Sequence, residues 1–266
     1  MTAGSSSPLR AGSESGASAY GRFIASVVSQ QLQAWMPAGG ARVLDISRSD
    51  SSRGSHGVGD ALARGGADVF RILSLETELP HGVVPASGPV CAPRHPAVRC
   101  VVGDTRFLDW FRSACVGAVV AEGSALSSCL ATEHTVEQAA RLLRPGGRLL
   151  LSVDSLLYGL ASLAEQHRWP ELADATAADV VLVPDDRGSV TRCFGPEELR
   201  DLVEAAGFDV DWVRPRTVLP PDVVDHAVAR DPGVLPDLVA SELSLADEHQ
   251  GESLGMYLTL SATLRR

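Results

Sequence analysis

The sequence contains no lysine and no asparagine among its 266 residues, so all 23 residues in the combined lysine and arginine count are arginines. The missing lysine excludes several classes of enzyme. A P-loop nucleotide site, a Schiff-base site for pyridoxal phosphate and a kinase-type ATP site each need that amine. Codons for both missing residues are rich in A, so a GC-rich coding sequence accounts for both absences.

Cysteine is scarce and irregularly spaced. The five cysteines are Cys91, Cys100, Cys115, Cys129 and Cys193. No pair has the short CxxC spacing of a zinc or redox site, and no fourth ligand joins Cys91, His95 and Cys100, so the sequence predicts no metal site. The odd number of cysteines and the lack of a secretory signal pattern indicate a reducing cytoplasm.

Long apolar runs and excess positive charge are also missing. No stretch reaches the roughly 20 apolar residues that a membrane-spanning helix needs, so we expect no membrane association. The formal net charge is −10 and the isoelectric point is about 5.1. An acidic surface repels phosphate backbones, which disfavours nucleic acid as a partner and favours a small molecule.

The length and composition suit one large α/β domain, with 45% hydrophobic and 21% charged residues. Residues 1–17 are rich in serine, glycine and alanine, which predicts a disordered tail. Residues 18–266 then form a single domain. The segment 155–195 departs from the regular alternation of the core, and we interpret it as a substrate lid or insertion.

Helical and strand patterns alternate in the first part of the domain. The predicted helices cover residues 20–36, a short stretch around 58–62, and 135–143, and the predicted strands cover 42–46, 67–73, 98–102, 116–120 and 148–153. This alternation predicts parallel strands with right-handed crossovers and helices on both faces of a doubly wound sheet.

The second part has a different order. We predict a helix over 156–169, a hairpin of strands 179–184 and 189–194, a helix over 196–207, a strand over 208–213, helices over 221–230 and 234–248, and a closing strand over 254–264. Three acidic residues, Asp45, Asp104 and Glu122, fall at or near the carboxyl ends of predicted strands of the first part. Ligands of doubly wound sheets bind at the carboxyl ends of the strands, where these residues converge.

Three motifs resemble those of class I S-adenosylmethionine-dependent methyltransferases. They are RVLD at 42–45, VGDT at 102–105 and LLRPGGRLLL at 142–151, and the resemblance extends over about residues 19–264. The resemblance implies a Rossmann-like, seven-stranded, mostly parallel sheet with an antiparallel last strand. It also implies S-adenosyl-L-methionine as the cofactor and transfer of its methyl group, here to a small-molecule acceptor.

The resemblance also assigns roles to individual residues. Asp45 and Ser47 would organise the loop after the first strand, and Glu76 would bind the ribose. Asp104 and the backbone amide of Thr105 would meet the adenine. These assignments place the cofactor across the carboxyl ends of the first three strands.

Further assignments concern the reacting end of the cofactor. Glu122 and Gly123 end the fourth strand, where the family faces the methyl-bearing sulfur. Tyr20 opens the N-terminal helix, which closes over the cofactor in many relatives. His134 lies after the fourth strand, on the side of the acceptor, and is a candidate general base.

The loop after the first strand departs from the family pattern. The usual glycine-rich stretch is replaced by serine and arginine over 46–53, and Leu73 stands in place of the usual acid after the second strand. Serines could substitute for glycines, with Glu76 or Asp50 taking the ribose. Alternatively the cofactor pocket is degenerate and the protein is a non-catalytic binding or regulatory partner. A Rossmann-type oxidoreductase is a weaker alternative, because the GxGxxG fingerprint is missing.

Overall fold

The structure is a computed structural model, and it describes residues 18–36, 40–48, 57–73, 95–175, 178, 180–184 and 189–266. These residues form a seven-stranded sheet with the order β3-β2-β1-β4-β5-β9-β8. Strands β1 to β5 pair in parallel, and β9 runs antiparallel to both β5 and β8. The strands are β1 Arg42–Asp45, β2 Asp68–Leu73, β3 Val98–Val102, β4 Val116–Ala121, β5 Leu143–Asp154, β8 Phe208–Arg216 and β9 Tyr257–Leu264.

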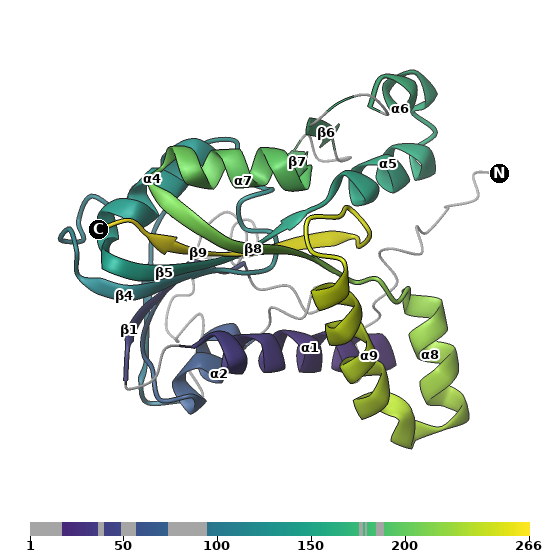
Figure 1. Ribbon diagram of the computed structural model, residues 1–266, viewed down its shortest axis with the longest axis horizontal. Coiled ribbons are helices and arrows are strands. Elements are labelled where there is room, and N and C mark those ends of the chain that lie inside the picture. Colours follow the sequence, from purple (N-terminus) through teal and green to yellow (C-terminus); the bar gives the residue numbers. More distant parts are fainter. Residues whose placement is uncertain are drawn as a thin grey trace, which may run out of the picture.

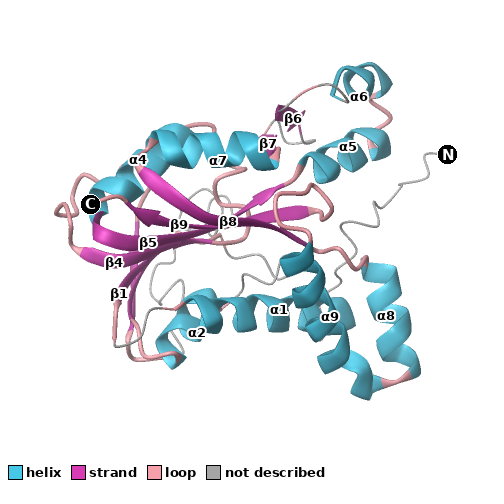
Figure 2. Ribbon diagram, viewed as in Figure 1, coloured by secondary structure: helices cyan, strands magenta, loops and turns pink. Residues whose placement is uncertain are grey.

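Helices cover both faces of this sheet. Figure 1 shows α1, α2, α8 and α9 on one face and α4 and α7 on the other, and Figure 2 shows the same layers by secondary structure. These helices are α1 Ala19–Trp35, α2 Val58–Arg64, α4 Thr132–Leu142, α7 Pro196–Ala205, α8 Pro221–Arg230 and α9 Leu235–Glu248, with a short 3-10 helix at Pro232–Val234. The predicted doubly wound, Rossmann-like fold with an antiparallel last strand is confirmed.

The two faces of the sheet bury alternate side chains, as the period of two along a strand requires. Leu44 and Leu149 belong to the cluster that includes residues of α4 and α7. Val43 and Leu150, their neighbours in sequence, belong to the cluster that includes residues of α1 and α2. Each large aliphatic side chain buried in this way contributes about 1.5–3 kcal/mol of transfer free energy.

The segment between β5 and α7 forms a separate layer beyond one end of the sheet (Figure 1). It contains α5 Leu156–Glu165, α6 Trp169–Ala175 and a two-stranded antiparallel sheet of β6 Val180–Pro184 and β7 Val190–Phe194. Its apolar residues form their own cluster around Leu163, Val181, Val183 and Cys193. Its role as a substrate lid stays a prediction.

The sequence predicted one helix over 156–169, whereas the structure has two. The chain turns at His167, whose φ is +56°, and restarts at Trp169. Pro170 stands in the first turn of α6, where its missing N–H needs no partner. Two strands are longer than the sequence predicted. Strand β5 begins at Leu143, which pairs with Val116, and not at residue 148. Strand β8 continues to Arg216 and does not end at residue 213.

A close approach of two backbone segments fixes the end of β8. A Cβ at buried Gly255 would overlap the carbonyl oxygen of Arg216 and lie 2.8 Å from its backbone nitrogen. We expect Gly255→Ala to lower the free energy of unfolding by about 1–3 kcal/mol, because backbone atoms cannot rotate away from the added methyl group. Urea unfolding followed by circular dichroism measures this loss.

Gly117→Ala is the matched control, because the nearest atom to its added Cβ is the Arg42 carbonyl oxygen at an ordinary 3.7 Å. We expect that variant to keep the stability of the original chain. A Gly255→Ala variant equally stable would contradict the close approach.

Candidate functional site

Strand β1 ends at a buried carboxylate. Asp45 is fully buried, and its Oδ1 accepts the backbone N–H of Ser47 at 2.9 Å. Its Oδ2 lies 3.9 Å from Nε of Arg71, a buried residue paired with it on β2. A Cβ at Gly59 of α2 would lie 3.1 Å from the same Oδ2. Asp45 therefore shapes the start of the loop after β1, and its carboxylate faces Arg71 and α2.

The pairing between β1 and β4 continues past the end of β1. The Ile46 amide donates to the Val120 carbonyl and the Arg48 amide donates to the Glu122 carbonyl, both at 2.9 Å. Between them, Ser47 is 2% exposed and its Oγ accepts the Glu122 amide at 2.9 Å. The Ser47 hydroxyl therefore holds the loop after β1 against the end of β4.

A buried ion pair lies at the end of β4. The side chains of Glu122 and Arg216 are 0% and 2% exposed. The guanidinium donates one hydrogen bond to each carboxylate oxygen, at 2.6 and 3.0 Å. The Nε of Arg216 donates to Oε1 of Gln31 at 2.9 Å. The ion pair thus joins β4, β8 and α1. Such fully desolvated, bidentate pairs are strong where both partners are present.

Two opposed effects set the ionisation of Glu122. Complete burial alone would raise its pKa, but the Arg216 guanidinium and hydrogen bonds from Ser152 and the Gly123 amide outweigh burial. The pKa of Glu122 therefore lies below its ordinary value, and the carboxylate stays ionised at neutral pH. The sequence analysis did not identify Arg216, because nothing local distinguishes a buried, paired arginine at the end of a strand from a solvent-exposed one.

The carboxylate of Asp104 also has an arginine partner. Its Oδ1 accepts the backbone amide and Nε of Arg106, each at 2.9 Å, and its Oδ2 accepts Nη2 at 2.6 Å. These hydrogen bonds hold the pKa of Asp104 below its ordinary value. The two side chains are 37% and 42% exposed. An adenine amino group at Asp104 would therefore share the carboxylate with Arg106.

The remaining predicted residues lie in different places. Thr105 is half-buried directly after Asp104, and Gly123 is buried after β4 with φ +72°. His134 is exposed near the start of α4, and its Nδ1 lies 3.8 Å from Oε2 of Glu137. Helix α4 lies on the face of the sheet opposite α1 (Figure 1). Glu76 lies outside the described residues.

Tyr20 lies in the first turn of α1, and its backbone amide donates to Oδ1 of Asp225 in α8 at 2.8 Å. Burial raises the pKa of the Tyr20 hydroxyl above its ordinary value, against the effect of the neighbouring Thr217 side chain. Tyr20 therefore stands at the junction of α1, α8 and the end of β8.

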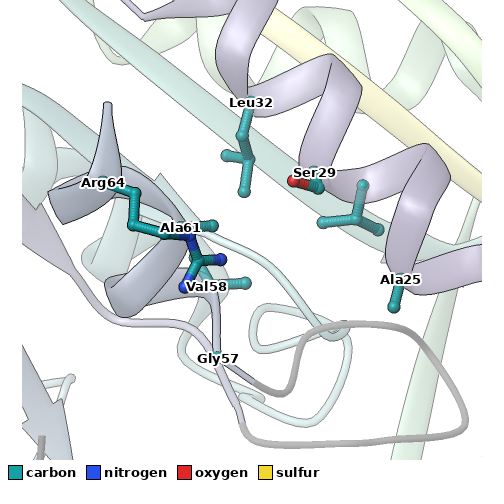
Figure 3. Close-up of a pocket in the computed structure, with 8 residues that line it drawn as sticks. Ala25, Ser29, Leu32, Gly57, Val58, Ala61 and Arg64 are labelled. Atoms are coloured by element: carbon teal, nitrogen blue, oxygen red, sulfur yellow. The ribbon is translucent and has the colours of Figure 1, made fainter. Parts of the chain in front are cut away.

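Two hollows lie along α1. One is a wide, shallow depression on the surface of α1 itself, bounded by Ala25, Ser26, Ser29 and Gln30. The other, of about 120 Å³, lies between α1 and α2, as Figure 3 shows, and is lined by Ala25, Val28, Ser29, Leu32, Gly57, Val58, Ala61 and Arg64. Small-molecule pockets commonly measure about 300–1,000 Å³ and enclose most of the ligand, so neither of these two hollows is by itself a ligand pocket.

The donor set of the described residues fits S-adenosylmethionine at the adenine end that the resemblance implies. Asp104 keeps a partly exposed carboxylate there, and Thr105 follows it. Within the described ranges, no three His, Cys, Asp or Glu side chains are grouped to hold a metal ion. In the same part of the chain, no helix combines the length and apolar character needed to cross a membrane.

The chain is similar to known proteins in its structure. No protein-family model and no curated protein matches the sequence. The 1,6-didemethyltoxoflavin-N1-methyltransferase of Burkholderia thailandensis, solved with S-adenosylhomocysteine, superposes with a TM-score of 0.51 at 17% identity, over 91% of this chain and 79% of that one.

Two further methyltransferases show the same similarity. An S-adenosylmethionine-dependent methyltransferase of Thermotoga maritima gives a TM-score of 0.52 at 16% identity, over 92% of each chain. One from Methanosarcina mazei gives 0.53 at 15% identity, over 88% of this chain and 97% of that one. The chain therefore has the class I S-adenosylmethionine-dependent methyltransferase fold, which its motifs predicted.

Removing one partner of the buried ion pair tests its contribution. We expect Arg216→Met to lower the free energy of unfolding by about 3–5 kcal/mol, because it leaves the Glu122 charge buried and unpaired. The double variant Glu122→Leu/Arg216→Met should recover most of this loss. Arg265→Met is the control, since its ion pair with Asp209 is exposed and such pairs contribute about 0–1 kcal/mol. Urea unfolding measures these free energies. Equal losses of stability in Arg216→Met and Arg265→Met would contradict the buried ion pair.

The ion pair also predicts a pH dependence. The pKa of Glu122 is lower in the folded protein than in the unfolded chain, so its contribution to stability is full above about pH 4.3 and is lost as the pH falls through the folded-state pKa. We expect the stability of the double variant Glu122→Leu/Arg216→Met to fall less steeply with acid. Parallel denaturation curves from neutral pH to pH 3 measure the difference, and identical slopes would refute it.

Proposed function

We propose that this protein binds S-adenosyl-L-methionine and transfers its methyl group to a small-molecule acceptor in the cytoplasm. The observation that carries the proposal is the partly exposed carboxylate of Asp104 just after β3, in a sheet with the methyltransferase strand order. In this fold, α1 and the carboxyl ends of β1 to β4 are the elements to which the resemblance assigns the cofactor.

The roles of the chain's own residues follow from their positions. Asp104 and Thr105 would hold the adenine, and the loop after β1, which Asp45 and Ser47 shape, would approach the methionine moiety. When bound, the cofactor supplies a sulfonium methyl group that a nucleophile displaces in line. The protein would orient the two reactants and exclude water, which supplies much of the rate enhancement of such reactions. His134 stays a candidate general base.

The acceptor is proposed to be small and not a nucleic acid. The net charge of −10 disfavours a polyanionic partner. The Burkholderia thailandensis methyltransferase, which shares the fold, was solved with the small molecule 1,6-didemethyltoxoflavin bound. That comparison is consistent with a small acceptor here.

A second candidate function is a non-catalytic binding or regulatory role. It is favoured by the arginines that hold Asp104 and Glu122, since both carboxylates have protein partners. A protein that keeps the fold and fills its cofactor contacts internally would use its surface for other partners. Cofactor binding distinguishes the two candidates.

Titration calorimetry with S-adenosylmethionine and S-adenosylhomocysteine tests the proposal. We expect both to bind and to raise the melting temperature, by an amount equivalent to about 2.7 kcal/mol at a ligand concentration of 100 times Kd. Asp104→Ala should weaken binding about tenfold or more, since a hydrogen bond to a charged group contributes about 1.5–3 kcal/mol. Asp109→Ala, an exposed acid in the same loop, is the control and should leave Kd unchanged. The absence of any response at millimolar cofactor would favour the non-catalytic role.

A further inference from the structure

The hydrogen bonds of the Asp104 carboxylate all come from one arginine. Arg106 donates its backbone amide and its Nε to Oδ1, each at 2.9 Å, and its Nε and Nη2 to Oδ2, at 3.0 and 2.6 Å. An ionised carboxylate offers about four acceptor sites in total. A further donor can therefore bind Asp104 fully only if the side chain of Arg106 gives up hydrogen bonds.

The loop that carries both residues is anchored by contacts other than this ion pair. Leu108 is fully buried, and Arg141 of α4 donates to the carbonyl oxygens of Leu108 and Phe111 at 2.8 and 2.9 Å. The ring of Trp110 stacks on that of Phe111, with the ring centroids 4.2 Å apart. The guanidinium of Arg106 can therefore move away while the loop backbone keeps its place.

The ion pair at Asp104 differs from the one at Glu122 in its exposure to water. The side chains of Asp104 and Arg106 are 37% and 42% exposed, whereas those of Glu122 and Arg216 are 0% and 2% exposed. Water solvates an exposed guanidinium that leaves its partner, so exposed pairs contribute little to stability. A buried charge that loses its partner has no such compensation. Another donor can therefore replace the arginine at Asp104.

Adenine carries a donor that needs the same carboxylate oxygens. Its exocyclic amino group donates hydrogen bonds, and a carboxylate can only accept them. The proposed function assigns this amino group to Asp104, where Arg106 already donates. The guanidinium and the amino group are therefore alternative partners of one carboxylate.

We propose that Arg106 competes with the adenine of the cofactor for Asp104, so that cofactor binding displaces the Arg106 side chain. This inference rests on the proposed function. Arg106 would then lower the affinity for any ligand whose amino group binds Asp104. It would not lower the affinity for a ligand of the same shape that lacks this amino group.

Two ligands of equal charge test the competition. S-adenosylhomocysteine carries the amino group, and S-inosylhomocysteine has an oxygen in its place; both are titrated calorimetrically into the full chain and into Arg106→Met. We expect the variant to bind S-adenosylhomocysteine about three- to fivefold more tightly, which is within the range that an exposed ion pair can supply. Its affinity for S-inosylhomocysteine should not increase. Unchanged or weaker binding of S-adenosylhomocysteine, or an equal gain for both ligands, would overturn the inference.

Further variants assign the effect to the ion pair. Arg112→Met is the matched control, because it removes the same charge from an exposed arginine of the same loop, and it should leave both affinities unchanged. In a chain that already carries Asp104→Ala, Arg106→Met should have no effect on S-adenosylhomocysteine, since no carboxylate remains for which to compete. A gain that persists without Asp104 would contradict the inference. Circular dichroism of each variant confirms that it is folded.

NMR spectroscopy can observe the displacement itself. The Nε–H group of Arg106 donates to Asp104, so its signal depends on whether the ion pair is formed. We expect saturation with S-adenosylhomocysteine to move this signal toward its position in the Asp104→Ala variant, in which no ion pair can form. A signal that keeps its position at saturation would show that the arginine stays on the carboxylate and would overturn the inference.

The titrations also separate this inference from the proposed function. If the original chain binds S-adenosylhomocysteine and Arg106→Met binds it no better, cofactor binding stands and the competition is refuted. If only Arg106→Met binds the ligand, the competition is supported in its strongest form. If neither chain binds it at millimolar concentration, both the cofactor site and the competition are refuted.

Discussion

The buried ion pair between Glu122 and Arg216 is the interaction on which the arrangement of the carboxyl edge depends. It connects the end of β4 with the end of β8, and through Gln31 it fixes α1 above both. Because neither charge reaches water, the guanidinium and the carboxylate must stay together. The hollow between α1 and α2 takes one wall from α1, which this ion pair helps to hold in place.

Arginine lies beside each described acidic residue that was predicted at a strand end. The pairs are Arg71 near Asp45, Arg106 at Asp104 and Arg216 at Glu122. A planar guanidinium can donate to both oxygens of a carboxylate, as it does at Asp104 and Glu122, and lysine cannot. Side-chain pairing therefore stabilises this edge of the sheet.

Two segments outside the seven-stranded sheet form apolar clusters. Helices α8 and α9 lie between β8 and β9 and pack on the first half of α1. The segment of α5, α6 and the β6–β7 hairpin has its own apolar cluster beyond β5. Similarity to methyltransferases at 15–17% identity establishes the fold. What the chain recognises is therefore a property of its own residues.

The sequence alone indicated the parallel strands and the helices on both faces, because hydrophobic periodicity acts locally. The antiparallel last strand followed from the resemblance that the motifs at 42–45, 102–105 and 142–151 carry, and the strand order came from the tertiary structure. The sequence also placed Asp45, Asp104 and Glu122 at strand ends. Tertiary structure decided which partner each carboxylate has. Arg216 lies 94 positions from Glu122 in the chain. No local pattern encodes this pairing, since it arises only when the strands assemble into the sheet and helix α1 packs across it.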